Sequence, residues 1–322
     1  MIPITRPNPE VAPVVLFVFN RPHLTTQSFE RIRQARPRRL FVVADGPRVG
    51  HPDDPELCEA TRKMVSSPDW KCELQTDFAE ENLGNGQRMS SGLDWVFQQC
   101  EEAIILEDDC LPSRSFFNFC TTLLTYYRDD TRVMHISGDN FQDGIHRGVG
   151  SYFFSRYPLT WGWASWARAW QYYDFKICHW PEARELAWLH SFLDNPVEIR
   201  YWTMIFERLH RGLIDTWDYQ WLFACWYHNG LSIQPNVNLV SNVGAGPDAT
   251  HHKVPHSTIG IPPLELADLL HPGQVQRDRR ADRFTFRKHI APSQPPLLQR
   301  IRDTIALRSR IKSLLSRPHT VS

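Results

Sequence analysis

Three adjacent carboxylates, Glu107, Asp108 and Asp109, are the residues of this 322-residue chain best suited to chemistry. They directly follow an apolar run at 103–106 that is typical of a buried strand. In an extended segment, side chains alternate, which predicts Glu107 and Asp109 on one side and Asp108 on the other. Adjacent carboxylates repel one another unless a cation neutralises them, and Mg²⁺ or Mn²⁺ bridging substrate phosphates needs only one or two protein carboxylates. An exposed acidic turn is the alternative, but the preceding strand favours a metal site.

A second acidic pair, Asp215 and Asp218, could supply a general base. A hydroxyl group that attacks a substrate must lose its proton, and a nearby carboxylate can take it. Asp218 is flanked by Trp217 and Tyr219, and aromatic neighbours that exclude water raise a carboxyl pKa. Asp218 is therefore the first choice and Asp215 the reserve, although Asp218 could also cap a helix at 219–228.

Two further segments could bind ligands. Trp161 and Trp163, separated by Gly162, offer indole faces on which the C–H-rich face of a sugar can pack, and the glycine allows close backbone approach. Core packing is the alternative for these tryptophans. His251 and His252 follow a glycine-rich stretch and could complete a metal site, although adjacent histidines are rarely both ligands and the sequence favours a pair on an exposed loop.

Alternating strands and helices must position these residues. Apolar runs at 14–19, 40–44, 103–106 and 133–137 indicate strands, and helices are expected at 25–34, 88–99, 115–127, 198–210 and 219–228. A further strand is expected at 231–233 and a loop at 236–250. This order predicts an α/β fold with a mostly parallel sheet flanked by helices. Ligands bind beyond the carboxyl ends of such strands, where Asn20, Arg21, Asp45 and the acidic motif are expected to meet.

The order of several motifs resembles inverting GT-A glycosyltransferases, and most closely the N-acetylglucosaminyltransferase I type. The resemblance covers about residues 13–252. Its motifs are Asn20-Arg21-Pro22, Asp45-Gly46, Leu106-Glu107-Asp108-Asp109, Ser115-Phe116-Phe117-Asn118-Phe119, Ile136-Ser137-Gly138-Asp139-Asn140 and Trp161-Gly162-Trp163. It implies a Rossmann-like GT-A domain at 10–265, with a donor half at 13–140 and an acceptor half at 141–265. A linker and a basic, helical C-terminal tail would occupy 266–322.

The resemblance also implies roles for single residues. Asp109 would hold Mn²⁺ or Mg²⁺, with His251 as a further ligand, and Glu107 and Asp108 would face the donor's sugar and ribose. The nucleoside would contact residues at the first two strand ends, namely Asn20, Arg21 and Asp45. The stretch 82–88 is richer in glycine than the resemblance leads one to expect. Its Asn85 and Arg88 would either contact the nucleotide or belong to a flexible loop and helix start.

The charge distribution limits the function classes. The chain has 36 basic and 36 acidic side chains, which argues against a strongly basic nucleic-acid binder. Residues 275–322 carry twelve basic and three acidic side chains, so the remainder is acidic overall. A basic, imperfectly amphipathic helix at 297–317 could rest on anionic lipid, or be an ordinary solvated or docked helix. With no apolar run near the roughly 18 residues that cross a bilayer, we expect a cytoplasmic protein, which the basic helix would place at the inner face of the membrane if it binds lipid.

These features predict a glycosyltransferase of cell-surface polysaccharide biosynthesis. By the resemblance, it would move a sugar from a UDP-linked nucleotide-diphospho-sugar to a hydroxyl of a glycan or lipid-linked glycan. A metal-dependent phosphoesterase could use the same acidic strand end, although its additional Asp and His ligands are not evident. A non-catalytic nucleotide-sugar or glycan-binding protein is the other alternative.

Overall fold

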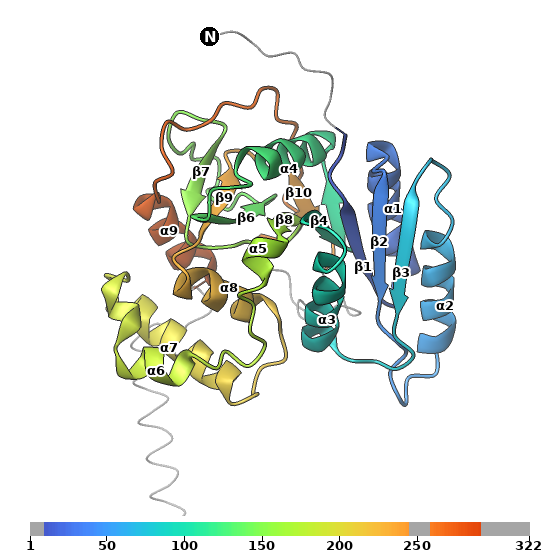
Figure 1. Ribbon diagram of the computed structural model, residues 1–322, viewed down its shortest axis with the longest axis horizontal. Coiled ribbons are helices and arrows are strands. Elements are labelled where there is room, and N and C mark those ends of the chain that lie inside the picture. Colours follow the sequence, from blue (N-terminus) through green and yellow to red (C-terminus); the bar gives the residue numbers. More distant parts are fainter. Residues whose placement is uncertain (1–9, 245–257, 291–322) are drawn as a thin grey trace, which may run out of the picture.

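The computed structural model describes residues 10–244 and 258–290. An eight-stranded mixed sheet forms its centre, with strand order β3-β2-β1-β4-β8-β6-β9-β7 (Figure 1). A two-stranded antiparallel sheet pairs β5 (Cys110–Pro112) with β10 (Val240–Asn242). The predicted α/β class, with a mostly parallel sheet flanked by helices, is confirmed.

One half of the large sheet is parallel throughout. Its strands are β1 (Val14–Val18), β2 (Arg39–Ala44), β3 (Glu73–Phe78) and β4 (Glu102–Glu107). Every residue of β1 is buried, as expected for a strand covered on both faces. In the register, Val18 lies opposite Ala44 and Phe17 lies opposite Glu107, so the carboxyl ends of these strands meet at one edge.

The strand order reverses beside β1. From β1 the chain proceeds to β2 and β3 on one side, whereas β4 pairs with β1 on the other side. Such a reversal leaves a crevice at the carboxyl ends, where ligands bind in open α/β sheets. The residues that follow β1 and β4 therefore stand at the position where this fold can bind a ligand.

The second half of the sheet mixes strand directions. It contains β8 (Trp163–Trp166), β6 (Val133–Ser137), β9 (Leu231–Pro235) and β7 (Tyr152–Ser155). β8 is antiparallel to both β4 and β6, β9 is parallel to β6, and β7 is antiparallel to β9. Because β8 pairs with β4, the chain entering β8 passes close to the acidic motif.

Helices cover both faces, as Figure 1 shows. One face packs against α1 (Pro22–Ala35), α2 (Asp54–Val65) and α4 (Arg114–Tyr126). The other packs against α3 (Asn85–Phe97), α5 (Ala167–Trp170), α6 (Trp180–Glu185), the 3₁₀ helix η1 (Trp188–Ser191), α7 (Pro196–His210) and α8 (Asp218–Tyr227). Alternate residues of β1 join the two cores, Val15 and Phe17 on one side and Leu16 and Val18 on the other.

Two local expectations from the sequence are wrong or incomplete. The stretch 236–250, expected to be a loop, contains β10, whose Val240 is buried and pairs with Pro112. The elements α2 and β3 were not predicted; β3 is an amphipathic edge strand with no fully buried residue, so its apolar signal is weak.

The body extends past residue 265, where a linker was expected. Leu266 and Leu269 pack against the core. Further on, α9 (Arg279–Thr285) and the π-helix η2 (Phe286–Ile290) pack beside β7, and Asp282 of α9 is buried against Ser155. The packed structure therefore continues through Ile290, and the predicted tail helix lies outside the described residues.

In the part of the chain that the structure describes, no helix combines the length and apolar character needed to cross a membrane. The seven cysteines all carry free thiols.

Candidate functional site

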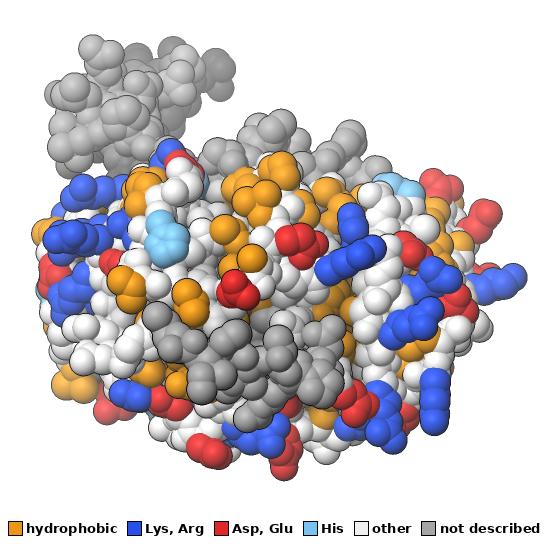
Figure 2. All heavy atoms as spheres, turned by 90° about the horizontal axis from the view of Figure 1, so that it is seen from above, with side chains coloured by type: hydrophobic (Ala, Val, Ile, Leu, Met, Phe, Trp, Pro, Cys, Tyr) orange, Lys and Arg blue, Asp and Glu red, His pale blue; other side chains and the backbone are white. Residues whose placement is uncertain are grey.

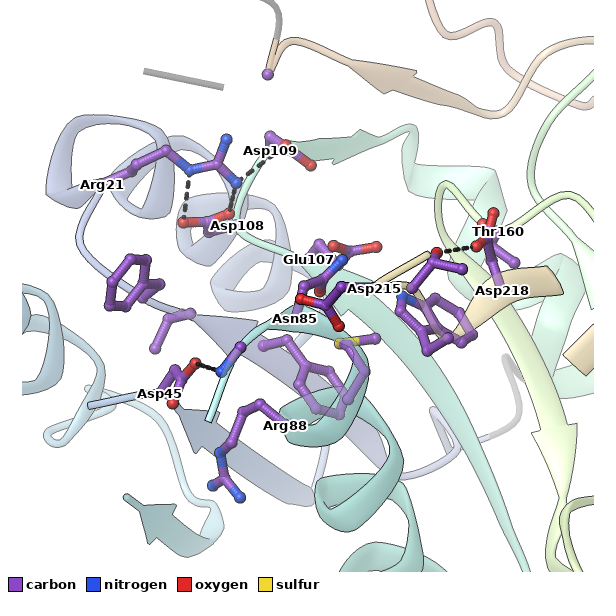
Figure 3. A pocket seen from close by; sticks show the side chains of 18 of the residues that line it. Arg21, Asp45, Asn85, Arg88, Glu107, Asp108, Asp109, Thr160, Asp215 and Asp218 are labelled. Carbon is purple, nitrogen blue, oxygen red and sulfur yellow. Dashed lines mark hydrogen bonds and ion pairs between the residues drawn. The ribbon is translucent and has the colours of Figure 1, made fainter. Parts of the chain in front are cut away.

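A cavity of about 660 Å³ opens at the carboxyl edge of the parallel strands. Figure 3 shows Arg21, Asp108 and Asp109 on one side of it, Asp218 on the other, and Glu107 and Asp215 between them. Its wall includes these predicted site residues: Asn20, Arg21, Asp45, Asn85, Arg88, Glu107, Asp108, Asp109, Trp161, Asp215 and Asp218. Its size falls in the range of small-molecule sites, roughly 300–1,000 Å³.

The acidic motif does not alternate as an extended strand would. β4 ends at Glu107, and Asp108 and Asp109 lie in a turn before β5. Ser28 of α1 holds this turn, because its hydroxyl oxygen lies 2.7 Å from the Asp108 carbonyl oxygen and 2.9 Å from that of Cys110. Consequently Asp108 and Asp109 face the same guanidinium, and the predicted separation of Asp108 from its neighbours is wrong.

Arg21 binds both aspartates of the turn. Its Nε lies 3.2 Å from Asp108 Oδ2, its Nη2 donates to Asp108 Oδ1, and Nη2 lies 3.0 Å from Asp109 Oδ2. Burial lowers the pKa of Arg21, but the charges of Asp108 and Asp109 outweigh it and the net shift is upward. With both oxygens engaged and the side chain only 4% exposed, Asp108 is committed to Arg21 rather than open to a ribose.

Two carboxyl groups of the acidic motif, those of Glu107 and Asp108, have raised pKa values. Burial, followed by the charges of Asp109 and Asp108, raises the pKa of Glu107 to about 8, and Asp218 contributes in the same direction. Burial likewise raises the pKa of Asp108 to about 6, although Arg21 opposes this shift. The influence of Asp218 on Glu107 places the two walls of the cavity within electrostatic range of each other.

Asp45 organises the loop after β3. Its carboxylate accepts hydrogen bonds from the backbone N–H groups of Gly46, Leu83 and Gly84 and from Asn82 Nδ2, at 2.8–3.1 Å. Burial raises its pKa, against the effect of these hydrogen bonds. The glycine-rich stretch is therefore a turn fixed on Asp45 that leads into α3 at Asn85, while still lining the cavity.

The other two arginines of the wall are also paired. Arg88 Nη2 lies 2.8 Å from Asp77 Oδ2, and its Nε donates to the Ala44 carbonyl. Arg48 binds Asp54 with both Nε and Nη2, and Asn20 Nδ2 donates to the same carboxylate at 2.7 Å. Asn20 is thus held in place by Asp54, a residue that the sequence did not single out.

Asp215 and Asp218 occupy different surroundings. Asp215 lies against the first turn of α3, so close that a Cβ at Gly86 would fall 2.6 Å from its Oδ1. Asp218 is the first residue of α8, and the N-cap is Trp217, so the predicted capping role is wrong. Its Oδ1 accepts a hydrogen bond from the Thr216 hydroxyl, and among the described residues nothing donates to its Oδ2.

The two tryptophans predicted to form a wall have different positions. Trp161 lines the cavity, and its backbone N–H donates to the buried Asp139 at 3.0 Å. Gly162 has φ +71°, a left-handed conformation that reverses the alternation of side chains. Trp163 is consequently 1% exposed, stacks on His135 and lies in the core, and Gly162 packs on Val240. The predicted ligand contacts of Gly162 and Trp163 are therefore wrong.

The donor set suits a divalent cation that is shared with a substrate. The described residues hold no group of three or more His, Cys, Asp or Glu arranged for a metal. Asp109 Oδ1 accepts from Asn242 and from the Cys110 thiol, whereas Oδ2 accepts only from Arg21 among the described residues and keeps a second lone pair. Carboxylates are the hard ligands that Mg²⁺ and Mn²⁺ prefer, and Mg²⁺ is usually held by one or two of them plus substrate phosphates. The predicted ligand His251 and its neighbour His252 lie outside the described residues.

The charged side chains of the cavity wall also favour a cation that is shared with a substrate. It holds six carboxyl side chains and three arginines, and each arginine is paired with a carboxylate. In this described lining, no unpaired guanidinium is left to neutralise a diphosphate. A diphosphate ligand would therefore need positive charge brought in with it.

Sequence reasoning missed several supports of the site. Asn242 and Gly244 close over Asp109, and a Cβ at Gly244 would fall 2.0 Å from Asp109 Oδ2. Thr216 orients Asp218, and Ser28 fixes the acidic turn. Of these residues, only Asn242 and Gly244 could have been suspected from the sequence, because Asn and Gly are typical of tight turns that pack closely. Nothing in the sequence distinguishes Ser28.

No family model and no curated protein matches the chain.

Proposed function

We propose that the chain is a metal-dependent inverting glycosyltransferase of the GT-A type. It moves a sugar from a nucleotide-diphospho-sugar, UDP-linked by resemblance, to a hydroxyl of a glycan or lipid-linked glycan. One observation carries the proposal: a single cavity is lined by the acidic motif with Arg21 and, across from Arg21, by Asp218, one of whose carboxylate oxygens accepts from no described residue. Inverting transfer needs this separation, because the base and the leaving diphosphate act on opposite faces of the sugar.

The reaction is a single displacement. The acceptor oxygen forms a bond to the anomeric carbon as the bond from that carbon to the diphosphate oxygen breaks, and the nucleoside diphosphate leaves with the electron pair. Asp218 Oδ2 takes the acceptor's proton, while Thr216 holds Oδ1 and fixes the direction of the carboxylate. Holding both reactants in one cavity supplies much of the rate enhancement.

Asp218 is a better base than Asp215. Asp215 lies against the N-terminal turn of α3, where a Cβ at Gly86 would fall 2.6 Å from its Oδ1, so its carboxylate is packed against that helix. Asp218 is flanked by aromatic rings, and its charge acts on Tyr219 and Tyr173, whose pKa values burial raises first and Asp218 raises further. Asp215 therefore shapes the cavity and Asp218 takes the proton.

The residues of the other wall hold the donor. Mn²⁺ or Mg²⁺ held by Asp109 would offset negative charge on the leaving diphosphate. Arg21 keeps Asp108 and Asp109 in place for it. Trp161 offers an aromatic face to a sugar, and the fixed turn at 82–84 closes the nucleoside end of the cavity.

The first test is ligand binding by thermal shift, with a panel of UDP-, GDP-, CMP- and dTDP-sugars, each with and without Mn²⁺. We expect a UDP-sugar to raise Tm only when Mn²⁺ is present, because binding to the folded state stabilises it. The matched enzymatic arm measures phosphate release from a simple phosphate ester. Release of phosphate without a nucleotide-sugar shift would replace the proposal by the phosphoesterase alternative.

A further inference from the structure

We propose that a basic face formed by α9, η2 and the loop 142–150 docks the folded body on an anionic membrane surface. This face surrounds a hollow lined by Arg147, Arg280, Arg283, Phe284, Arg287 and Lys288. It is separate from the cavity described above and belongs to the packed body, not to the C-terminal tail. Figure 2 shows Lys and Arg side chains gathered at the left edge of the molecule, the side that carries α9 in Figure 1.

The cations of this face are largely uncompensated. Arg280, Arg283 and Arg287 are exposed, and none of them forms an ion pair within the described ranges. Arg147 donates to the neutral Gln142, while Lys288 pairs with Asp143. Four of the five basic side chains therefore keep their charge available to an anionic partner.

The two acidic residues at and within α9 are engaged elsewhere, one as the helix cap and one in the core. Asp278 caps the helix, with Oδ1 accepting from the backbone N–H groups of Arg280 and Ala281 at 2.8 and 2.9 Å. Asp282 is 1% exposed and binds Arg277, Arg156 and Ser155. Both acids are thus engaged, and the exposed charged side chains of α9 are all arginines.

Apolar side chains protrude beside the cations. Val149 is 89% exposed and Ile145 is 43% exposed, and both lie within two residues of Arg147. Clustered Lys and Arg together with protruding apolar groups are the combination that binds the interface of anionic bilayers. A free phosphate or a nucleic acid would use the cations but gain nothing from Val149, so a lipid surface fits this face better.

The chain beyond Ile290 adds to the same charge. Residues 291–322 contain six basic side chains and one acidic side chain, directly after η2 in the sequence. The charge at the end of the described body is thus continuous in sequence with the basic tail.

The basic face is also connected to the cavity. Trp161 in the cavity wall packs edge-on against Phe141 at 5.4 Å between ring centroids, and Phe141 contacts His289 of η2 at 5.6 Å. Packed rings therefore join η2, next to the basic face, to the cavity wall at Trp161. The docking proposal does not depend on the proposed transfer reaction, because it is measured without turnover.

The test is flotation of the full-length chain with vesicles of phosphatidylcholine alone or with about 30% phosphatidylserine. We expect binding to the anionic vesicles only, and at least tenfold weaker binding for the triple variant R280E/R283E/R287E, since each basic residue contributes about 1 kcal/mol. V149S should weaken binding at physiological salt while leaving its salt dependence unchanged, because it removes only the apolar contribution.

Two control variants make the outcome decisive. R31E/R38E/K63E reverses three exposed charges on α1, just before β2 and on α2, at the other end of the sheet, and should bind as the unmodified chain does. R308E/R310E/K312E reverses three charges in the tail. The proposal is overturned if the α9–η2 triple variant binds like the unmodified chain, or if only the tail variant loses binding. If R280E/R283E/R287E loses binding to anionic vesicles but keeps the Tm shift caused by a nucleotide-sugar, the basic face acts independently of the proposed transfer site.

Discussion

Arg21, in the first residues after β1, binds both carboxylate oxygens of Asp108, which follows β4. The pair joins the two strands at which the sheet order reverses, and it is mostly buried, with side-chain exposures of 16% and 4%. Arg21 also reaches Asp109 at 3.0 Å. One guanidinium thus orders the acidic turn and neutralises part of its charge.

Replacing this guanidinium should expose that double role. Arg21→Gln leaves Asp108 buried without its partner, which costs on the order of 3 kcal/mol of folding free energy. The carboxylates then carry more uncompensated charge, so added Mn²⁺ should raise the Tm of the variant more than that of the unmodified chain. Urea unfolding and thermal shifts with and without Mn²⁺ measure both effects. Equal Mn²⁺ shifts in the two proteins would argue against a cation at these carboxylates.

Asp109 is the carboxylate on which cation binding should depend. Asp109→Ala removes the proposed ligand, and we expect Mn²⁺-dependent binding of UDP to fall at least tenfold in titration calorimetry. Asp129→Ala, at an exposed acidic position that does not line the cavity, is the control and should bind as before. Unchanged titration of the Asp109 variant would remove this residue from the metal site.

Gly86 sets the distance between α3 and the segment that carries Asp215 and Asp218. A Cβ there would lie 2.6 Å from Asp215 Oδ1 and 2.9 Å from the Thr216 carbonyl oxygen, so Gly86→Ala must push this segment away. We expect transfer to drop about tenfold or more, because small misplacements of reacting groups are costly, while the far-UV circular dichroism stays the same. Gly273→Ala, where a Cβ meets nothing within 4 Å, is the matched control. Full activity of the Gly86 variant would show that this spacing is not needed.

His135 should make the fold sensitive to acid. It is fully buried, its Nε2 lies 2.8 Å from the Leu159 carbonyl, and Trp221 Nε1 donates to its Nδ1, so the ring is held neutral. Burial lowers its pKa to about 3. Below pH 6.5 the unfolded chain takes up a proton that the folded chain refuses, so stability present above pH 6.5 is lost as the pH falls toward 3.

The loss assigned to this one group is about 3 kcal/mol between pH 6.5 and 4.5, at about 1.4 kcal/mol per pH unit. His135→Gln should be less stable at pH 7.5 but lose less on acidification, as measured by urea unfolding at both pH values. His51→Gln, at an exposed position, should keep the acid sensitivity of the unmodified chain. An unchanged pH slope in the His135 variant would contradict the assignment.

The strands and their polar ends could be predicted because buried runs such as Val14–Val18 are continuous, and because parallel strands bring their carboxyl ends together. The contacts within the site could not. Asp45 is saturated by donors from residues 82–84, and Ser28 reaches the acidic turn from α1; both contacts join segments far apart in the sequence. Trp163 was misplaced for a local reason, since the positive φ of Gly162 breaks the alternation that would have aligned it with Trp161.

The most direct measurement compares binding and transfer in Asp218→Asn. The amide keeps the shape of the side chain but cannot take a proton, so the variant should bind the nucleotide-sugar identified by thermal shift with Mn²⁺ as the unmodified chain does. Its transfer rate should fall by about 10²- to 10⁴-fold, the usual contribution of a general base, whereas Asp129→Asn should transfer normally. Retained binding with lost transfer is the predicted result, and near-normal turnover by Asp218→Asn would contradict the proposed mechanism.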